Sequence, residues 1–478
     1  MSVQALETIL HPRSVAVVGA SANVYSFGYS FVHHLVEYGF KGPIYPVNPN
    51  YPEIMGLKTY PSVRDIPGTV DFAISCVNAS QVTGMLEELA EKGVKGVHLY
   101  TARFSETGRQ DAAELEQAVL KLALDKGIRL IGPNCMGVYY PRVGLSFGFN
   151  LPKDSGPVGM ISQSGGGASG FVHLASLRGI RFSKVISYGN GLDLTECDYL
   201  DYFLQDQETK IILMYVEGVK DGRRFFETLT RATRLKPVII MKGGRGQAGS
   251  RMTFSHTASL AGSFPVWEAM VRQAGAVSAD DFDELIDLTV AFRFLPMVQG
   301  KRVGVIGGGG GPSVIAAEEC EESGLEVIPI PQEMREELKK RGVSIWDWIS
   351  NPVDLSIVAG SGVTDIDMLH LMGQHPSFDI LMANINEWVL ITLASDERFQ
   401  GLNSQITSHI NLRNTYSKPY VVIFGERGVI TGDHADWHWK VIAKARAELI
   451  RSGMATFPTF RRAARALRKV QEYYAGLG

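Results

Sequence analysis

Cysteine is scarce in this 478-residue chain, and no two cysteines have a spacing that indicates a shared structural role. The four residues, Cys76, Cys135, Cys197 and Cys320, lie far apart and form no C-x-x-C pair. The sequence therefore predicts neither a disulfide framework nor a thiolate metal site. With neither feature present, we expect a reducing compartment, the cytoplasm.

An excess of charge of one sign and long apolar runs are missing as well. The formal net charge is -3, so no broad basic field is present, and neither nucleic acid nor an anionic membrane is an expected partner. No run reaches the about 18 apolar residues that a membrane span requires. The first residues, MSVQALETILHPRS, also lack the apolar region of a secretory signal.

Several familiar binding and catalytic motifs are absent. The loop GASANVYSFG does not match G-x-G-x-x-G, and the following strand ends in PVNP without an acidic residue, which disfavours an NAD site. No G-x-S-x-G elbow of a hydrolase occurs. His434 and His438 have i,i+4 spacing but no evident third ligand, and His33 and His34 lie in an apolar helical pattern that indicates a structural role. We therefore expect no metal site.

One type of segment occurs three times in the chain. Each copy is a short apolar run, then a loop of small residues, then a helical pattern, and the runs begin at Ser14, Val158 and Arg302. Apolar runs of this kind are typical of parallel strands covered by helices on both faces. Strand and helix patterns alternate after each loop, so the sequence predicts an α/β fold of doubly wound sheets. The length is consistent with about three domains.

The second and third loops, SQSGGG and GGGGG, each precede a helical pattern. Small residues leave backbone N–H groups open at the positive end of a helix, which favours phosphate. Two such helix starts aimed at one point would stabilise a doubly charged phosphoryl group. For the first loop, Gly19 and Gly28 have the alternative use of permitting close helix–strand packing. The expected phosphate-binding residues are Ser162, Ser164, Gly165, Gly166, Gly309, Gly310 and Gly311.

A histidine follows the strand KPVIIM in a stretch of small and basic residues that leads to His256. A polar loop of this composition can carry a nucleophilic imidazole, because the neutral ring is abundant near pH 7 and its phosphorylated nitrogen is a good leaving group. Such a nucleophile needs an orienting acceptor. Glu217 ends the strand IILMYV at the edge where doubly wound sheets build their sites. The alternatives are an ordinary surface histidine and a solvated carboxylate.

Nine motifs occur in an order that resembles one known family. They are VAVVGAS, YPVNPNYPEIMGLKTYPSV, GPNCMG, ISQSGGG, YVEGV, KGGR, SHTASLAG, GGGGGPSVIAAEECEESGLEV and NPVDL. The order resembles the α subunit of NDP-forming acyl-CoA synthetases, relatives of succinyl-CoA synthetase. The match covers the chain apart from a weak stretch at 359–415. It implies a Rossmann-like CoA-binding domain at 1–149 and two flavodoxin-like domains, at 150–298 with the phosphohistidine loop and at 299–478.

The resemblance implies an acid–thiol ligase. Acyl-CoA and phosphate would give an acyl phosphate, the phosphoryl group would move to His256, held by Glu217, and then to ADP or GDP. The two glycine loops would cradle the phosphohistidine. The CoA-binding residues implied by the match are Gly19, Ala20, Ser21, Val47, Pro49, Asn134 and Cys135.

Nothing in the chain resembles an ATP-grasp unit, so the resemblance implies a separate β subunit in an α2β2 assembly. That subunit would bind ADP/ATP or GDP/GTP with Mg2+. The chain departs from the family at Asn50, often a lysine, near Ser26, where a basic residue is common, and at Ala258, often a glycine. The family's S-A-G-F segment reads TARF here, and Arg103 in it hints at an anionic acyl group.

Two alternatives to a synthetase subunit follow from the same residues. One is a non-catalytic protein that senses CoA or acyl-CoA, although such a protein would not need His256 and Glu217. The other is an acyltransferase relative with an added acetyltransferase domain, for which the tail after Phe457 is too short.

Overall fold

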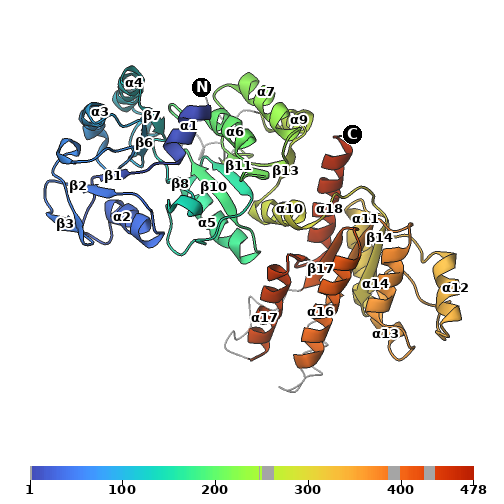
Figure 1. Ribbon diagram of the computed structural model, residues 1–478. Coiled ribbons are helices and arrows are strands. Elements are labelled where there is room, and N and C mark those ends of the chain that lie inside the picture. The colour runs from blue at the N-terminus through green and yellow to red at the C-terminus, as the bar shows by residue number, and fades with distance from the viewer. Residues whose placement is uncertain (1–2, 247, 250–262, 386–398, 425–436, 478) are drawn as a thin grey trace. The chain divides into compact units, whose positions relative to one another are not determined.

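The computed structural model describes residues 3–246, 248–249, 263–385, 399–424 and 437–477 (Figure 1). The chain divides into two compact units, Met1–Leu285 and Ile286–Gly478, here called unit 1 and unit 2. The described strands form three large sheets and one small hairpin. His256 lies outside the described residues.

The first sheet of unit 1 is parallel, in the order β2-β1-β5-β6-β7. β2 lies on one side of β1, and β5, β6 and β7 follow on the other side. The strand order therefore reverses between β1 and β5, which is where doubly wound folds bind ligands. Its strands are β1 (Val15–Val18), β2 (Ile44–Val47), β5 (Phe72–Ser75), β6 (Gly96–Leu99) and β7 (Arg129–Ile131). The other elements of this region are α1 (Val3–Leu10), α2 (Phe27–Glu37), α3 (Val82–Glu91), α4 (Gln110–Asp125), η1 (Val63–Asp65), η2 (Ala79–Gln81), η3 (Ser105–Thr107) and the hairpin β3 (Glu53–Ile54) and β4 (Leu57–Lys58).

The second sheet of unit 1 has the order β13-β12-β11-β9-β10-β8. All pairs are parallel except β8 with β10, and the order reverses between β9 and β11. Its strands are β8 (Gly137–Tyr139), β9 (Val158–Ser162), β10 (Phe182–Ser187), β11 (Ile211–Val216), β12 (Val238–Lys242) and β13 (Val277–Ala279). The helices of this region are η4 (Pro141–Val143), α5 (Gly165–Leu177), α6 (Glu196–Gln205), α7 (Gly222–Thr233), α9 (Phe264–Gln273) and α10 (Phe282–Phe294).

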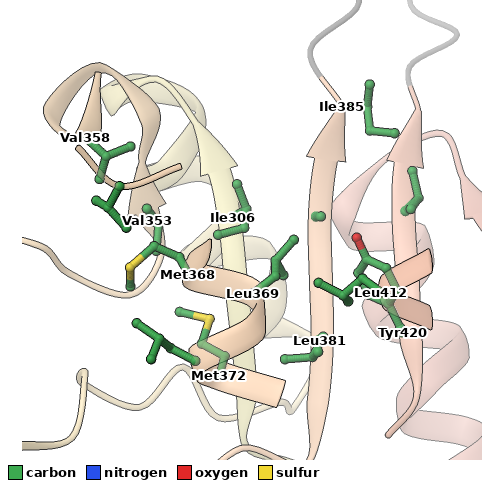
Figure 2. Packing of buried hydrophobic residues seen from close by; sticks show 14 of the residues in the cluster. Ile306, Val353, Val358, Met368, Leu369, Met372, Leu381, Ile385, Leu412 and Tyr420 are labelled. Atoms are coloured by element: carbon green, nitrogen blue, oxygen red, sulfur yellow. The ribbon is translucent and has the colours of Figure 1, made fainter. Parts of the chain in front are cut away.

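Unit 2 contains the third sheet, in the parallel order β15-β14-β16-β17-β18. Figure 2 shows its core, in which Met368 and Leu369 of one helix lie against the strands that carry Ile306 and Leu381. The strands are β14 (Val303–Gly308), β15 (Val353–Asp354), β16 (Ile380–Ile385), β17 (Tyr420–Phe424) and β18 (Ala455–Phe457). The helices are α11 (Gly310–Glu322), α12 (Gln332–Lys340), α13 (Leu355–Val358), α14 (Asp365–Gln374), α16 (Phe399–Thr415), α17 (Trp437–Arg451) and α18 (Phe460–Ala475).

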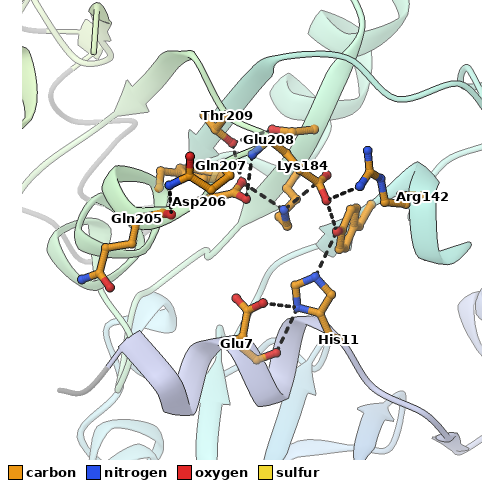
Figure 3. A network of polar contacts seen from close by, with 12 residues as sticks. Glu7, His11, Arg142, Lys184, Gln205, Asp206, Gln207, Glu208 and Thr209 are labelled. Carbon is orange, nitrogen blue, oxygen red and sulfur yellow. Dashed lines mark hydrogen bonds and ion pairs between the residues drawn. The ribbon is translucent and has the colours of Figure 1, made fainter. Parts of the chain in front are cut away.

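A buried lysine ties α1 and η4 to the second sheet (Figure 3). Lys184 of β10 is fully buried, and its Nζ lies 3.0 Å from Asp206 Oδ2 and 3.6 Å from Glu208 Oε2. The same Nζ lies 4.2 Å from the centre of the Tyr140 ring, whose hydroxyl donates to Glu208 Oε1 at 2.9 Å. His11 Nε2 of the N-terminal segment lies 3.0 Å from that hydroxyl. Because these charges are removed from water, the loss of any one partner would leave an uncompensated buried charge and lower the stability of the fold.

The three sheets confirm the α/β fold of doubly wound domains that the repeated strand–loop–helix segments predict. All three share one arrangement, in which the first parallel strand (β1, β9 or β14) is flanked by the next two strands of its sheet, with the antiparallel β8 added at the edge of the second sheet. The boundaries at 149/150 and 298/299 stay predictions, although Gly137–Tyr139 pairs with the second sheet and not the first. Within the described ranges, no helix is long and apolar enough to cross a bilayer.

Candidate functional site

The carboxyl ends of β9 and β11 meet where the second sheet reverses its order, and three predicted site residues lie there. Ser162 ends β9, Ser164 follows it, and Glu217 follows β11. Because the two strands are paired, with Ser162 opposite Tyr215, residues that follow them emerge at the same edge. The structure therefore brings these three residues together, as the sequence predicts.

Gln163 joins the two strand ends directly. Its side-chain Oε1 accepts hydrogen bonds from the backbone N–H of Glu217, at 2.6 Å, and of Gly218, at 3.1 Å. Its own backbone N–H donates to Tyr215 O at 3.0 Å. Gln163 is only 3% exposed, so these bonds are shielded from competing water. The turn that carries Glu217 is thus held by a residue that sequence analysis did not single out.

The start of α5 presents an open anion-binding geometry. Ser164 is the N-cap, and its Oγ accepts the N–H of Gly167 at 3.0 Å. Ser162 Oγ donates to Ser164 O at 2.7 Å. The N–H groups of Gly165 and Gly166 have no acceptor among the described residues, and a Cβ on Gly166 would meet nothing within 4 Å. Open N–H groups at the positive end of a helix suit a phosphate or phosphoryl oxygen.

Glu217 lies in a buried polar environment with a lysine beside its backbone. Glu217 is 6% exposed, and Lys242 Nζ, at the end of β12, donates to Glu217 O at 2.6 Å. Burial lowers the pKa of Lys242 to about 8, although the nearby Glu217 charge opposes the shift. Burial, and then the same charge, raises the pKa of Tyr215 to about 12. A carboxylate held in this way can orient an imidazole, as the acidic member of a catalytic triad does.

The stretch that leads toward His256 is anchored where it leaves β12. Arg245 Nε donates to Lys242 O at 3.2 Å, and its guanidinium pairs with Asp280 at 3.0 Å. His256 itself and Ala258 lie outside the described residues, so the pairing of His256 with Glu217 stays a prediction. Lys242 is a second residue at this edge that sequence analysis did not assign. Its position at the end of β12, the strand next to β11, is the sequence signal that could have identified it.

The third glycine loop lies in unit 2 at the start of α11. Gly309 is the N-cap, and α11 begins at Gly310. A Cβ on Gly310 would lie 3.1 Å from Asp354 Oδ2, so a carboxylate already lies beside this helix start, where the dipole favours negative charge. A Cβ on Gly311 would meet nothing within 4 Å. The prediction that both helix starts serve one phosphoryl group stays a prediction.

Most of the predicted CoA-binding residues gather at the end of β1 in the first sheet. Gly19 has a φ of +84°, and its N–H donates to Val47 O at 3.0 Å. Asn48 Nδ2 donates to Ala20 O at 2.7 Å. A Cβ on Gly28 would lie 2.2 Å from Gly19 O, so glycine is required for α2 to approach the turn. The turn also contains Ser21, and Pro49 follows the neighbouring strand β2. The close packing is thus a property of the structure, and CoA binding at this turn stays a prediction.

The two other predicted CoA-binding residues lie in the loop after β7 and point differently. Asn134 has a φ of +58°, and its Nδ2 lies 3.4 Å from Asn190 Oδ1. Cys135 is 3% exposed, and burial raises the pKa of its thiol. His98 Nε2 donates to Cys135 O at 2.9 Å. The Cys135 side chain therefore packs inward, and its carbonyl is already occupied by His98.

A cleft of about 750 Å³ opens at the carboxyl ends of β5 and β6, and Cys76, Tyr100, Thr101 and Arg103 are among its lining residues. Arg103 has a φ of +79°, and its N–H donates to Glu106 Oε1 at 2.5 Å. Arg103 forms no ion pair with any residue that the structure describes. Glu106 caps the loop in which it lies. Such a contact leaves no periodic pattern in the sequence, so the sequence could not predict the cleft or this backbone geometry.

Comparisons with known proteins agree with this arrangement. The model of the CoA binding domain matches residues 13–141, and that of the succinyl-CoA ligase like flavodoxin domain matches residues 155–292. The α subunit of ADP-forming acetate–CoA ligase II from Pyrococcus furiosus is 40% identical over 378 residues, which are 79% of this chain and 82% of that protein. ADP-forming acetate–CoA ligase from Methanocaldococcus jannaschii is 39% identical over 73% of this chain. The match covers 49% of that longer relative.

A solved structure is similar over nearly the whole chain. It is the dinucleotide forming acetyl-coenzyme A synthetase 1 of Ca. Korarchaeum cryptofilum in complex with phosphate and ADP, with 30% sequence identity and a TM-score of 0.79. The alignment covers 98% of this chain and 97% of that one. On the identity and coverage of these relatives, the chain belongs to the family of ADP-forming acyl-CoA synthetases, as an acid–thiol ligase subunit of the α type.

Proposed function

We propose that this chain binds CoA and carries a phosphoryl group on His256 within an NDP-forming acyl-CoA synthetase. The observation that supports this most is the edge of the second sheet. There the open N–H groups of Gly165 and Gly166 and the buried Glu217 lie on neighbouring strand ends that Gln163 joins. A cluster of anion-binding donors beside an orienting carboxylate is what phosphoryl transfer to an imidazole requires.

The proposed reaction has three displacements. A phosphate oxygen attacks the thioester carbonyl of acyl-CoA, and CoA leaves as the thiol. A ring nitrogen of His256 then attacks the phosphorus of the acyl phosphate, and the carboxylate leaves. Finally, the terminal phosphate oxygen of the NDP attacks the same phosphorus, and neutral imidazole leaves with NTP formed. The start of α5 would stabilise the phosphoryl oxygens, and Glu217 would hold the other ring nitrogen as its charge develops.

We propose that CoA binds at the turn after β1, with the predicted contacts from Gly19, Ala20, Ser21, Val47 and Pro49. The loop at Asn134 and Cys135 would lie at the thioester end. The turn supports this, because the close approach of α2 places a helix start and open backbone beside it. Relatives named as α subunits support a separate partner. We propose that the partner is an ATP-grasp β subunit in an α2β2 assembly that holds ADP/ATP or GDP/GTP with Mg2+.

The four unpaired cysteines of the structure support a reducing location, for which we propose the cytoplasm.

The proposed function itself is tested by phosphoryl transfer from nucleotide. The chain is mixed with an ATP-grasp β subunit and γ-labelled ATP, and the label on this chain is then treated with acid and with base.

We expect an acid-labile, base-stable label that is absent from His256→Ala. Glu217→Gln should slow labelling by on the order of a hundredfold, because an orienting charge is lost. Glu227→Gln, an exposed carboxylate on α7, is the matched control and should label at the normal rate. A chain that binds CoA but is never labelled would instead be the non-catalytic CoA-binding protein. Label that persists in His256→Ala would remove the histidine from the reaction.

A further inference from the structure

Three metal-ligating side chains converge on one face of α2, away from the residues assigned above. His33 and His34 are adjacent, and Glu37 follows His33 by one helical turn. One ligand atom from each, an imidazole nitrogen of each histidine and a carboxylate oxygen of Glu37, lies within 4.8 Å of the other two. Side chains at i and i+4 share a helix face, which explains why His33 and Glu37 meet.

Each of the three side chains has one shielded polar atom that makes no hydrogen bond. Within the described part of the chain, His33 Nδ1, His34 Nδ1 and Glu37 Oε2 are all shielded from solvent and lack a hydrogen-bond partner. His34 is 98% buried, with 2% of its surface exposed. Buried polar atoms in folded proteins nearly always have a partner, so the unbonded His34 Nδ1 beside the His33–Glu37 pair indicates a missing ligand.

One distance between ligand atoms already equals that of a tetrahedral cation site, and the ligand atoms all lie within 4.8 Å of one another. His33 Nδ1 lies 3.4 Å from Glu37 Oε2. Ligands at about 2.0–2.1 Å from Zn2+ in tetrahedral geometry are separated by about 3.4 Å. Pairs of ligand atoms as far apart as 4.8 Å would have to close by about 1.4 Å, which a rotation of the side chains can supply.

The cluster lies beside the Phe149 ring and a lysine. The surrounding rings are apolar neighbours, since the Phe149 centroid lies 4.4 Å from that of His34 and 5.5 Å from that of His33. A cation, Lys153 Nζ, lies 3.9 Å from Glu37 Oε1, whereas Glu37 Oε2 is the oxygen that pairs with His33.

We propose that His33, His34 and Glu37 bind one Zn2+ ion, with water as the fourth ligand. Imidazole and carboxylate are ligands that Zn2+ accepts, and three protein ligands with one open position form a recognised type of zinc site. The alternative is a His33–Glu37 pair, whose Nδ1 and Oε2 atoms lie 3.4 Å apart, beside a histidine that only fills space, and that alternative leaves the buried His34 Nδ1 without a partner. The site would fix α2 against Phe149, in the helix that begins beside the proposed CoA turn.

The test uses the full chain, freed of metal with a chelator and titrated with Zn2+ by calorimetry and with Co2+ by visible absorption. We expect one equivalent of Zn2+, and for Co2+ the intense d–d bands of a tetrahedral site. His33→Ala and Glu37→Gln, both with side chains 29% exposed, should fold and should each raise the Kd for Zn2+ at least tenfold.

Two controls separate this site from others. His11→Ala changes a histidine that likewise pairs with a glutamate four residues away, Glu7. No histidine is adjacent to His11 in the sequence, and the variant should bind Zn2+ normally. A double variant of His434 and His438 removes the other histidine pair of the sequence and should also bind normally. Zn2+ binding that survives in His33→Ala, that disappears only in the His434 and His438 variant, or that never occurs would overturn the proposal.

Discussion

Gln163→Met isolates the residue that holds the Glu217 turn. The substitution keeps the length of the side chain but removes the oxygen that accepts from Glu217 N–H at 2.6 Å and from Gly218 N–H at 3.1 Å. A buried donor left without its acceptor costs about 1 to 3 kcal/mol. Two donors at the low end of that range cost about 2 kcal/mol, which corresponds to a factor of about 30 in a local opening equilibrium.

Hydrogen–deuterium exchange measures this opening directly. Peptides that cover 211–221 should exchange at Glu217 and Gly218 about 30-fold faster in Gln163→Met than in the unchanged chain. The matched control is Gln110→Met, at an exposed position of α4, which should leave these amides protected. Labelling of the chain from ATP should also slow, because a catalytic group displaced by about 1 Å can cost about a hundredfold in rate. Unchanged protection at Glu217 and Gly218 would refute the role given to Gln163.

Three further substitutions test other parts of the structure. Gly28→Ala places a Cβ 2.2 Å from Gly19 O, so calorimetry should show CoA affinity reduced at least tenfold, whereas Gly84→Ala, with nothing within 4 Å of its Cβ, should stabilise α3 by about 0.5 to 1 kcal/mol. Lys184→Met leaves buried carboxylates uncompensated and should lower the free energy of unfolding in urea by about 3 to 5 kcal/mol. Burial lowers the pKa of His98 to about 4, below its unfolded value near 6.5, so the unfolded chain binds the proton first and stability is lost as the pH falls from 6.5 to 4. The loss should reach about 1.4 kcal/mol at pH 5.5 and about 3 kcal/mol at pH 4, and a urea series in His98→Gln should lack this part of the pH dependence.

The doubly wound sheets could be predicted from sequence because their strands are buried on both faces. A parallel strand such as Val158–Ser162 is fully buried, so it reads as an unbroken apolar run followed by small residues. The meeting of Ser162 and Glu217 could be predicted for the same reason, because residues at the carboxyl ends of paired parallel strands share an edge. Gly137–Tyr139 could not be placed, since three residues of an antiparallel edge strand have no period of their own.

Side-chain contacts with the backbone were beyond prediction. The sequence shows a glutamine at 163 but not which N–H groups its amide oxygen meets, and it shows Arg103 but not that Glu106 holds its loop at a φ of +79°. Cys135 was predicted in a loop at the thioester end of CoA. Its thiol packs inward, because the hydrogen bond from His98 Nε2 to Cys135 O fixes that loop. His33 and His34 looked structural because a helical pattern does not reveal whether a buried imidazole finds a partner.

The central claim is that His256 carries phosphate between the acyl group and the nucleotide. It is tested most directly from the acyl side, without nucleotide, by mixing the chain and its β subunit with labelled inorganic phosphate and a series of acyl-CoA thioesters with neutral and anionic acyl groups. With at least one of them we expect one label per chain on a peptide that contains His256, and we expect added ADP to remove it as labelled ATP. Label that enters without any acyl-CoA, that maps to another residue, or that ADP cannot discharge would contradict the account.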